Sequence, residues 1–424
     1  MKRAGSYRKC GFVVALFLLT VTVRAGGDTP RPLPNHPGNI FVEGENVSLA
    51  GDSKQAGGWK LVDYDGKTIK EAKSGAEPME FGKLPIGYYE LRGADGKTQT
   101  TIGVIAPLAA PTPKTSPIGI DVAMAWIYPD EAQRHAVANL CNLAGMNWVR
   151  DRMSWPELES KPGEFAPPNR YDQTAELQTK AGLNVLQVNH IGPPWLKNAK
   201  RFPLDLRDAY RFYKEMAKRF KGKIVALEPW NEADIDMFGG HTGCEMASMQ
   251  KASYLGIKAG NPDMIACQNV FAIARPETLA DFTANRAGPY FDRFDVHHYV
   301  ALHRYDEYYA LYRAASSGKP MWVTEFNITV SWSGDPKAQE PNDQNLHIQA
   351  ERVAKMFSKT LFNGVKAQFY FMLPHYVEGK LQYGLLRPDL TPRPGYVSLA
   401  AAGRLLAGAK PLGRLKVANE DVTG

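Results

Sequence analysis

The sequence predicts an α/β fold, a (β/α)8 TIM barrel preceded by a small all-β sandwich domain. Three observations support this prediction. Strand-like and helix-like segments alternate eight times after residue 118, short β-forming runs fill residues 38–106, and a proline-rich segment separates the two regions. We therefore expect a β-sandwich at 38–106, a linker at 107–117 and a barrel at 118–412.

The eight strand–helix units are the count that a TIM barrel requires. Each predicted strand is short and mainly apolar, and the helices carry apolar residues at three-to-four spacing. An open doubly wound sheet is the alternative, but no glycine-rich phosphate turn follows any of these strands. We expect strands at 118–124, 146–150, 183–189, 224–230, 264–269, 294–299, 321–326 and 365–371, and helices at 130–144, 170–182, 205–220, 243–259, 276–285, 305–317, 342–363 and 395–407.

The region before the linker is predicted to be all-β. Asp65-Gly66 and Asp95-Gly96 stand beside runs of β-forming residues and are hairpin signals. The domain is either a carbohydrate-binding module or a structural buttress for the barrel, and we expect the buttress.

The N-terminus has the order of a secretory signal peptide at 1–25. A basic stretch precedes the apolar run 11–23, and small residues flank Arg24 at the end of that run. The run is too short for a membrane span, which needs roughly 20 residues. We expect cleavage after Ala25, a secreted or periplasmic protein, and no membrane association after cleavage.

Charge and cysteine content narrow the function classes. Without residues 1–25 the chain has 46 basic and 44 acidic residues, a net charge of +2, which gives no reason to expect a nucleic-acid partner. The remaining cysteines, Cys141, Cys244 and Cys267, are an odd number, so no disulfide framework is expected. We expect buried free thiols, with a Cys244–Cys267 bridge as the alternative.

Polar residues follow five of the eight predicted strands. In a TIM barrel the C-terminal ends of the strands share one face, where the active site lies. Glu232 follows the fourth strand and Glu325 ends the seventh, on opposite sides of that face. Hydrolysis of an acetal needs one protonated and one ionised carboxyl group across the bond. The two glutamates therefore indicate glycoside hydrolysis.

The motifs around these glutamates carry a family resemblance. Residues 116–412 resemble the clan A glycoside hydrolases, within them families 5 and 39. The similar motifs are Gly145-Met-Asn-Trp-Val-Arg150 with its following loop, Trp230-Asn231-Glu232, Asp295-Val-His297-His-Tyr299, Trp322-Val-Thr-Glu325, and residues 383–394 after the eighth strand.

The resemblance implies a retaining glycosidase in which Glu232 is the acid/base and Glu325 the nucleophile. It also implies that Asn231 bonds the sugar 2-hydroxyl and that Arg150 holds Glu325 ionised. His297 and Tyr299 share one strand face by their spacing of two residues, whereas His298 faces the other way. The expected substrate-binding residues are Asn231, Arg150, His297, Tyr299, Asn189, His190, Trp155 and Trp195.

The sequence departs from the clan at the end of the eighth strand. The clan commonly has a tryptophan there as a floor for the sugar, and this strand has none. Tyr370, Phe371 or Trp332 is the expected replacement. Arg150, Arg152 and Arg387 would be compatible with an acidic sugar as the substrate, although we expect structural roles for them.

We expect a poly- or oligosaccharide substrate, no cofactor, no metal and a monomer. Two rival functions stand beside the hydrolase. The first is a carbohydrate-binding barrel without turnover. The second is a metal-dependent hydrolase that uses His190, His297, His298 and Glu232 as ligands.

Overall fold

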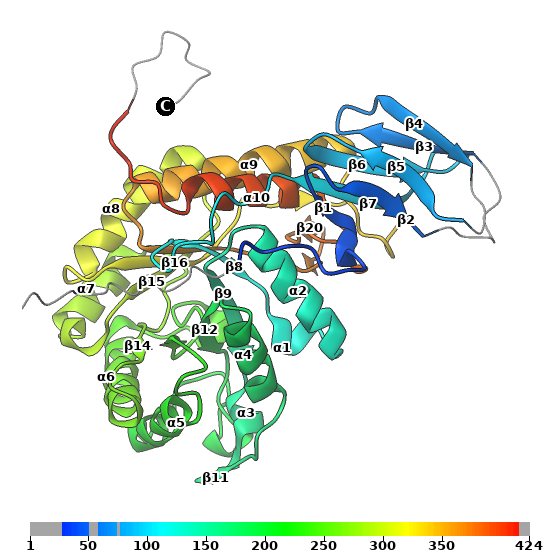
Figure 1. Cartoon of the computed structure of the whole chain (residues 1–424). Coiled ribbons are helices and arrows are strands. Elements are labelled where there is room, and N and C mark those ends of the chain that lie inside the picture. Colours follow the sequence, from blue (N-terminus) through cyan, green and yellow to red (C-terminus); the bar gives the residue numbers. More distant parts are fainter. Residues whose placement is uncertain (1–27, 51–57, 74–76, 415–424) are drawn as a thin grey trace, which may run out of the picture.

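The computed structural model describes residues 28–50, 58–73 and 77–414 (Figure 1). The predicted signal peptide at 1–25 lies outside the described residues. Within these residues, no helix combines the length and the hydrophobicity that a membrane span needs.

Eight parallel strands form the sheet at the centre of the main domain, and the predicted fold class is confirmed. Their order in the sheet is β14-β13-β12-β9-β8-β18-β16-β15. The first and last strands of this order are joined by isolated parallel bridges, Cys267 with Arg293 and Phe271 with Val296. The strands are β8 (Ile118–Asp121), β9 (Trp148–Met153), β12 (Asn184–Asn189), β13 (Ala226–Glu228), β14 (Ile265–Ala266), β15 (Phe294–His298), β16 (Met321–Phe326) and β18 (Ala367–Tyr370).

The helices that cover the sheet begin and end within two residues of their predicted positions. Side-chain caps explain several starts: Asp130 accepts a hydrogen bond from the backbone of Gln133, and Thr242 forms a capping box with Glu245. The helices are α2 (Glu131–Leu143), α4 (Arg170–Lys180), α5 (Leu206–Arg219), α6 (Gly243–Gly260), α7 (Pro276–Ala284), α8 (Tyr305–Ala315), α9 (Asp343–Phe362) and α10 (Pro394–Leu406).

Short elements lie in the loops after the strands, on the face where an active site is expected. They are α1 (Met124–Ile127), α3 (Trp155–Leu158), β10 (Glu159–Lys161), β11 (Glu164–Phe165), and a three-stranded antiparallel sheet of β17 (Val330–Ser331), β20 (Leu381–Gln382) and β19 (Val377–Glu378). The last two strands form a hairpin between β18 and α10.

Apolar side chains fill the interior of the barrel at the N-terminal ends of the strands. Gly119 leaves room for this plug, because a Cβ atom there would lie 2.9 Å from Trp148 Cβ and 3.0 Å from Phe369. The filled end is a packed core and leaves no opening there, so a ligand can reach the barrel at the opposite end. The cluster consists of Trp148, Leu186, Ala226, Cys267, Trp322, Ala367 and Phe369.

The N-terminal region forms a five-stranded and a two-stranded sheet around its own apolar core. Hairpins connect β3 to β4 and β6 to β7 at the predicted turns, where Gly66 and Gly96 adopt positive φ angles of 80° and 76°. The five-stranded sheet has the order β1-β7-β6-β3-β4. Its strands are β1 (Ile40–Val42), β3 (Gly58–Asp63), β4 (Thr68–Lys73), β6 (Gly87–Arg92) and β7 (Thr98–Ile105), and β2 (Asn46–Leu49) pairs with β5 (Met79–Lys83).

This region is attached to the barrel next to α9 and α10 (Figure 1). Arg387, which follows the β19–β20 hairpin, donates hydrogen bonds to Thr101 Oγ1 at 2.6 Å and to the Tyr88 hydroxyl at 3.1 Å. The Tyr64 ring stacks on His347 of α9 at a centroid distance of 3.9 Å. Such attachment favours the buttress interpretation.

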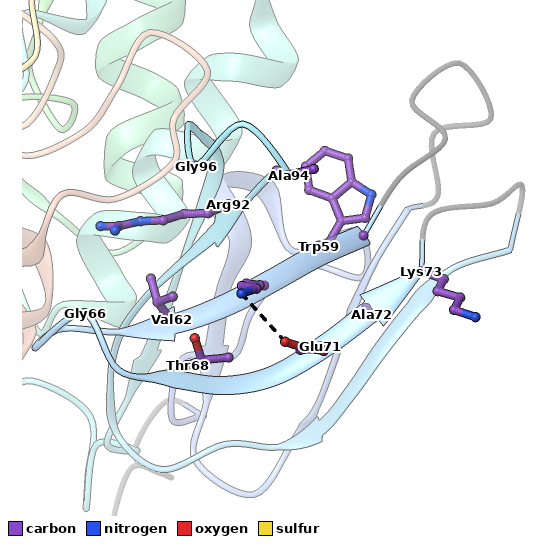
Figure 2. A pocket seen from close by; sticks show the side chains of 13 residues that line it. Trp59, Val62, Gly66, Thr68, Glu71, Ala72, Lys73, Arg92, Ala94 and Gly96 are labelled. Carbon is purple, nitrogen blue, oxygen red and sulfur yellow. Dashed lines mark ion pairs between the residues drawn. The ribbon is translucent and has the colours of Figure 1, made fainter.

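The face of β3 and β4 carries a pocket of about 680 Å³ (Figure 2). Lys60 and Glu71 form an ion pair across it at 3.8 Å. Trp59 is the aromatic residue in its lining, but its side chain belongs to the domain core and is only 7% exposed. A sugar-stacking platform needs an exposed ring, so this pocket gives no support to a carbohydrate-binding module.

The three cysteines of the described region are free thiols, and the alternative Cys244–Cys267 bridge is absent there. Cys141 and Cys267 are buried as expected. Cys244 is exposed, so the prediction of burial is wrong for this residue. It lies at the start of α6, where its side chain contacts Thr242 and not the core.

Candidate active site

Glu232 and Glu325 face each other at the C-terminal end of the barrel. His297 lies between them, with its Nδ1 atom 2.9 Å from Glu232 Oε1 and 3.5 Å from Glu325 Oε2. One side-chain atom from each of the three residues lies within 4.8 Å of the others. The structure therefore brings together two carboxyl groups that are 93 residues apart in the chain.

The backbone around Glu232 is held in an unusual conformation. Glu232 follows β13 with a φ angle of 41°, in the left-handed region that residues other than glycine rarely adopt. Hydrogen bonds on both sides maintain this turn: the Asn231 amide donates to Asn189 O and the Ala233 amide donates to Val270 O. Strained residues of this kind cluster at functional sites.

Arg150 of β9 is the hub of a buried ion-pair network beneath the two glutamates. Its Nη1 atom lies 2.9 Å from Asp121 Oδ2 and 2.5 Å from Glu325 Oε1. Its Nη2 atom lies 2.6 Å from Glu228 Oε1 and donates to Asn231 Oδ1 at 2.7 Å. Arg150 thus lies where the predicted role toward Glu325 requires it.

The two glutamates have different electrostatic surroundings. Burial raises the pKa of Glu232 well above its usual value, and the charge of Glu325 raises it further, while Arg150 opposes the shift. Glu325 instead accepts hydrogen bonds from Arg150 and from the Tyr299 hydroxyl, the latter at 2.8 Å. Burial lowers the pKa of His297 well below its usual value, so its ring is neutral. The arrangement suits a proton donor at Glu232 and a carboxylate at Glu325.

This difference predicts a pH dependence. Because the raised pKa keeps Glu232 protonated above the usual range of a glutamate, kcat/KM is expected to fall as the pH rises through the pKa of Glu232. A kcat/KM profile on a 2,4-dinitrophenyl glycoside, whose leaving group needs no proton, serves as the comparison. With that substrate the wild type should show a weak alkaline limb or none, because no proton is needed. A limb as steep as that on a glycoside with a poor leaving group would contradict the assignment.

Six predicted site residues converge on this face of the barrel. Asn231 uses its oxygen to accept from Arg150, so its amide nitrogen is the donor left for a ligand. Tyr299, directly after β15, is 41% exposed and its hydroxyl reaches Glu325. The six are Arg150, Asn231, Glu232, His297, Tyr299 and Glu325.

The prediction that Trp155 and Asn189 contact the sugar is wrong. Trp155 is fully buried and stacks on Phe212 of α5 at a centroid distance of 4.3 Å. Asn189 Oδ1 accepts from the Trp155 backbone amide, and its Nδ2 donates to Ile191 O. Both side chains stabilise the loops after β9 and β12 and are not available to a ligand.

Trp195 and His190 stay predictions. Trp195 is half-buried and donates through Nε1 to Glu159 O. The centroid of the His190 ring lies 5.0 Å from that of Trp126 and 5.5 Å from that of Phe238. Burial and the charge of Arg152 lower the pKa of His190.

Several residues of the site were not among the predicted ones. Asp121 and Glu228 are fully buried partners of Arg150, and their signal was a carboxylate at an inward-facing strand position. Of the three aromatic residues considered as the floor, Phe371 is the one that lies beside Tyr299, whose hydroxyl bonds Glu325. Its ring lies 6.4 Å from Tyr299, whereas Tyr370 packs outward against Phe326.

The metal set of the rival function, three histidines and Glu232, is not assembled among the described residues. His298 Nε2 is 2.7 Å from the Tyr309 hydroxyl of α8, on the outer side of the strand as its spacing predicts. Glu232, His297 and Glu325 are close enough to hold a cation. Arg150 already supplies a positive charge against Glu325 at 2.5 Å, which disfavours a second cation there.

Residues 230–392 match the family model described as "glycosyl hydrolase catalytic core". The matched segment begins at Trp230, beside Glu232, and includes Glu325. No curated protein matches the chain.

Solved structures share the fold. A family 39 glycoside hydrolase from the gut symbiont Bacteroides cellulosilyticus WH2 is similar at a TM-score of 0.70 and 17% identity, over 90% of this chain and 84% of that one. A family 5, subfamily 18 protein from Streptomyces cattleya, in complex with Manβ1-4GlcNAc, has a TM-score of 0.57 and 15% identity, over 70% of this chain and 82% of that one. A family 39 β-xylosidase from Caulobacter crescentus has a TM-score of 0.55 and 17% identity, over 74% of this chain and 76% of that one. The predicted resemblance to glycoside hydrolases of families 5 and 39 is confirmed for the fold, and the family model adds the match to a glycosyl hydrolase catalytic core.

Proposed function

We propose that this glycosidase, whose barrel matches a glycosyl hydrolase catalytic core, cleaves O-glycosidic bonds of a poly- or oligosaccharide with retention. The approach of Glu232 and Glu325, with side-chain atoms within 4.8 Å, carries the proposal. Retaining enzymes have carboxyl groups about 5–5.5 Å apart, and inverting enzymes leave about 6.5–9.5 Å for a water molecule. The spacing here supports direct attack by a carboxylate.

In the first step Glu325 attacks the anomeric carbon while the protonated Glu232 gives its proton to the leaving oxygen. A bond forms between Glu325 and the sugar as the glycosidic C–O bond breaks. Arg150 and the Tyr299 hydroxyl hold the attacking carboxylate in position through their hydrogen bonds.

In the second step Glu232, now ionised, takes a proton from water, which attacks the same carbon and releases Glu325. Once Glu325 is esterified it no longer carries a charge, so one of the two effects that raise the Glu232 pKa is removed. Glu232 is then more readily ionised and available as the base. His297 contacts both groups at Nδ1 and orients them through the cycle.

Export is part of the proposal. The basic stretch and the apolar run 11–23 support a cleaved signal peptide and a secreted or periplasmic protein. N-terminal sequencing of the protein from the medium or periplasm, with Gly26 as the expected first residue, tests this.

The acid/base role is tested with Glu232→Ala on an aryl glycoside with a good leaving group. Its first step needs no acid, so the glycosyl enzyme forms and accumulates because no base activates water. Azide needs no base, so adding it should raise turnover by about 10- to 100-fold and yield a glycosyl azide of unchanged anomeric configuration.

Exposed Glu351 of α9, paired with Lys355, offers a matched control, since Glu351→Ala should behave as wild type. An azide product of inverted configuration would overturn retention. Binding of glycans by the wild type without any hydrolysis would favour the non-hydrolytic alternative.

A further inference from the structure

We propose that Glu378, on the hairpin after the eighth strand, binds hydroxyl groups of the sugar that Glu325 attacks, so that the site takes neutral sugars and rejects uronic acids. This inference rests on the proposed hydrolase function and extends it to the class of substrate.

Two phenols hold the Glu378 carboxylate. The Tyr376 hydroxyl donates to Glu378 Oε1 at 2.8 Å, and the Tyr383 hydroxyl donates to Oε2 at 3.0 Å. Each bond uses one acceptor position of a carboxylate oxygen, and each oxygen has a second one. The remaining positions of a fixed, exposed carboxylate match two neighbouring hydroxyl groups of a pyranose or furanose ring.

Aromatic contacts place Glu378 on the side of the nucleophile. The Tyr383 ring is 6.1 Å from the Tyr299 ring, and the Tyr299 hydroxyl bonds Glu325. Phe371 lies 5.4 Å from Tyr383 and completes the cluster. Glu378 is also near enough to Glu232 for its charge to affect that group. The glycone, the sugar unit whose anomeric carbon Glu325 attacks, is therefore expected to contact this cluster.

The hairpin is held rigidly, as a recognition element must be to bind with little entropic cost. Trp332 donates through Nε1 to Gly379 O at 2.9 Å, and Gln382 donates to Gln339 O at 3.0 Å. The Lys380 ammonium lies 3.6 Å from the centroid of the Trp332 ring, so it is engaged beside Glu378 without pairing with it.

The three arginines that are compatible with an acidic sugar are already paired with acids of the protein. Arg150 is fully buried in its network. Arg152 lies near this cluster, 5.9 Å from the centroid of the Phe371 ring, but it is only 3% exposed and pairs with Asp121 Oδ2 at 2.5 Å and with Glu325 Oε1 at 3.7 Å. Arg387 is bound to Glu340 and to the N-terminal domain. Exposed Arg275 follows β14 and donates to Asp234 O, two residues beyond Glu232. The glycone side thus presents Glu378 and Glu325 with no free guanidinium among the described residues above.

A uronic acid would bring a third carboxylate to this side. The uronate and Glu378 would repel each other, and no described arginine is free to pair with either of them. A neutral sugar instead supplies the hydroxyl donors that an ionised Glu378 accepts.

Matched substrates test the proposal: 4-nitrophenyl glycosides of glucose and galactose, in both anomeric forms, against the corresponding glucuronides and galacturonides. Each pair differs only at C6. We expect the better neutral member to exceed its uronide by at least about 100-fold in kcat/KM, as for loss of a charge-assisted contact together with repulsion. A uronide cleaved faster than its neutral partner would overturn the inference.

Variants then assign the effect to Glu378. Glu378→Ala should lower kcat/KM for the neutral glycoside by about 10- to 100-fold. Glu378→Gln keeps the shape of the side chain and removes its charge. It should therefore lower the ratio of kcat/KM for the neutral glycoside to kcat/KM for the uronide by about tenfold. Tyr383→Phe, which frees one carboxylate oxygen, should raise KM with a smaller change in kcat. Glu351→Gln is the matched exposed control.

The two proposals fail in different ways. If no glycoside of the panel is cleaved, the hydrolase proposal fails. If neutral glycosides are cleaved and Glu378→Ala and Glu378→Gln leave both kcat/KM and the uronide ratio at wild-type values, only the role of Glu378 is overturned. Circular dichroism and thermal melting of each variant separate lost recognition from lost folding.

Discussion

Replacing Glu325 with alanine is expected to abolish turnover, lowering kcat by about four to six orders of magnitude, as removal of a catalytic nucleophile does in other enzymes. The side chain is the attacking group, and its partner Glu232 cannot take its place because it is protonated and serves the leaving oxygen. The effect should be on kcat and not on binding, since the groups that contact the sugar remain.

Steady-state kinetics on a cleaved aryl glycoside measure this loss, with Glu351→Ala as the control and a thermal melt to establish folding. Trapping adds a direct readout: a 2-fluoro glycosyl fluoride should add one sugar mass to wild type at Glu325 and none to Glu325→Ala. Near-normal activity of Glu325→Ala, or labelling at another carboxylate, would rule out the double displacement.

Replacing Arg150 with methionine is expected to lower the free energy of unfolding by about 3–5 kcal/mol, the cost of removing one partner from a buried ion pair. Methionine keeps much of the volume but leaves Asp121, Glu228 and Glu325 without their shared cation. Activity should fall as well, because Glu325 loses the donor that holds it ionised and in position.

The loss of stability should depend on pH. Burial raises the pKa values of Asp121 and Glu228 already in the native protein, and without Arg150 they rise further. A carboxyl group with a raised folded pKa destabilises the native state as the pH rises from about 4, its unfolded value, through the folded pKa. The deficit of Arg150→Met should therefore be larger at about pH 8 than at about pH 5.

Urea unfolding at both pH values provides the measurement. Arg207 is the matched control, because it pairs with Asp205 at the same 2.6 Å as Arg150 with Glu228 but is 89% exposed. An exposed pair contributes about 0–1 kcal/mol, so Arg207→Met should cost little at either pH. Equal costs for the two variants would contradict the role of the buried network.

The alternation of strands and helices was predictable because it depends on local patterns. All eight barrel helices begin and end within two residues of the predicted positions, since caps such as Asp130 and apolar spacing are encoded locally. The strands were less sharply bounded: the fifth was expected at 264–269, and β14 covers only Ile265–Ala266. Short buried strands have no periodicity that marks their ends.

The polar residues after the strands illustrate what a position in the chain leaves undecided. Glu232 and Trp155 both follow a strand, yet Glu232 reaches the site and Trp155 stacks in the core on Phe212. The direction of a loop side chain depends on the backbone turn and on which neighbour packs against it. Glu378 could not be predicted as a site residue for the same reason, because its hydrogen bonds with Tyr376 and Tyr383 exist only in the folded hairpin.

By itself the sequence determined the class of fold and the two carboxylates, because strand order in a barrel carries chemically useful residues to one face wherever they stand in the chain. Only the tertiary structure decided how those carboxylates differ. Burial, the Arg150 guanidinium that three acids share, and the hydrogen bond from Tyr299 are properties of groups brought together from distant strands. The proton's location in the site is set by those distances, which no stretch of sequence contains.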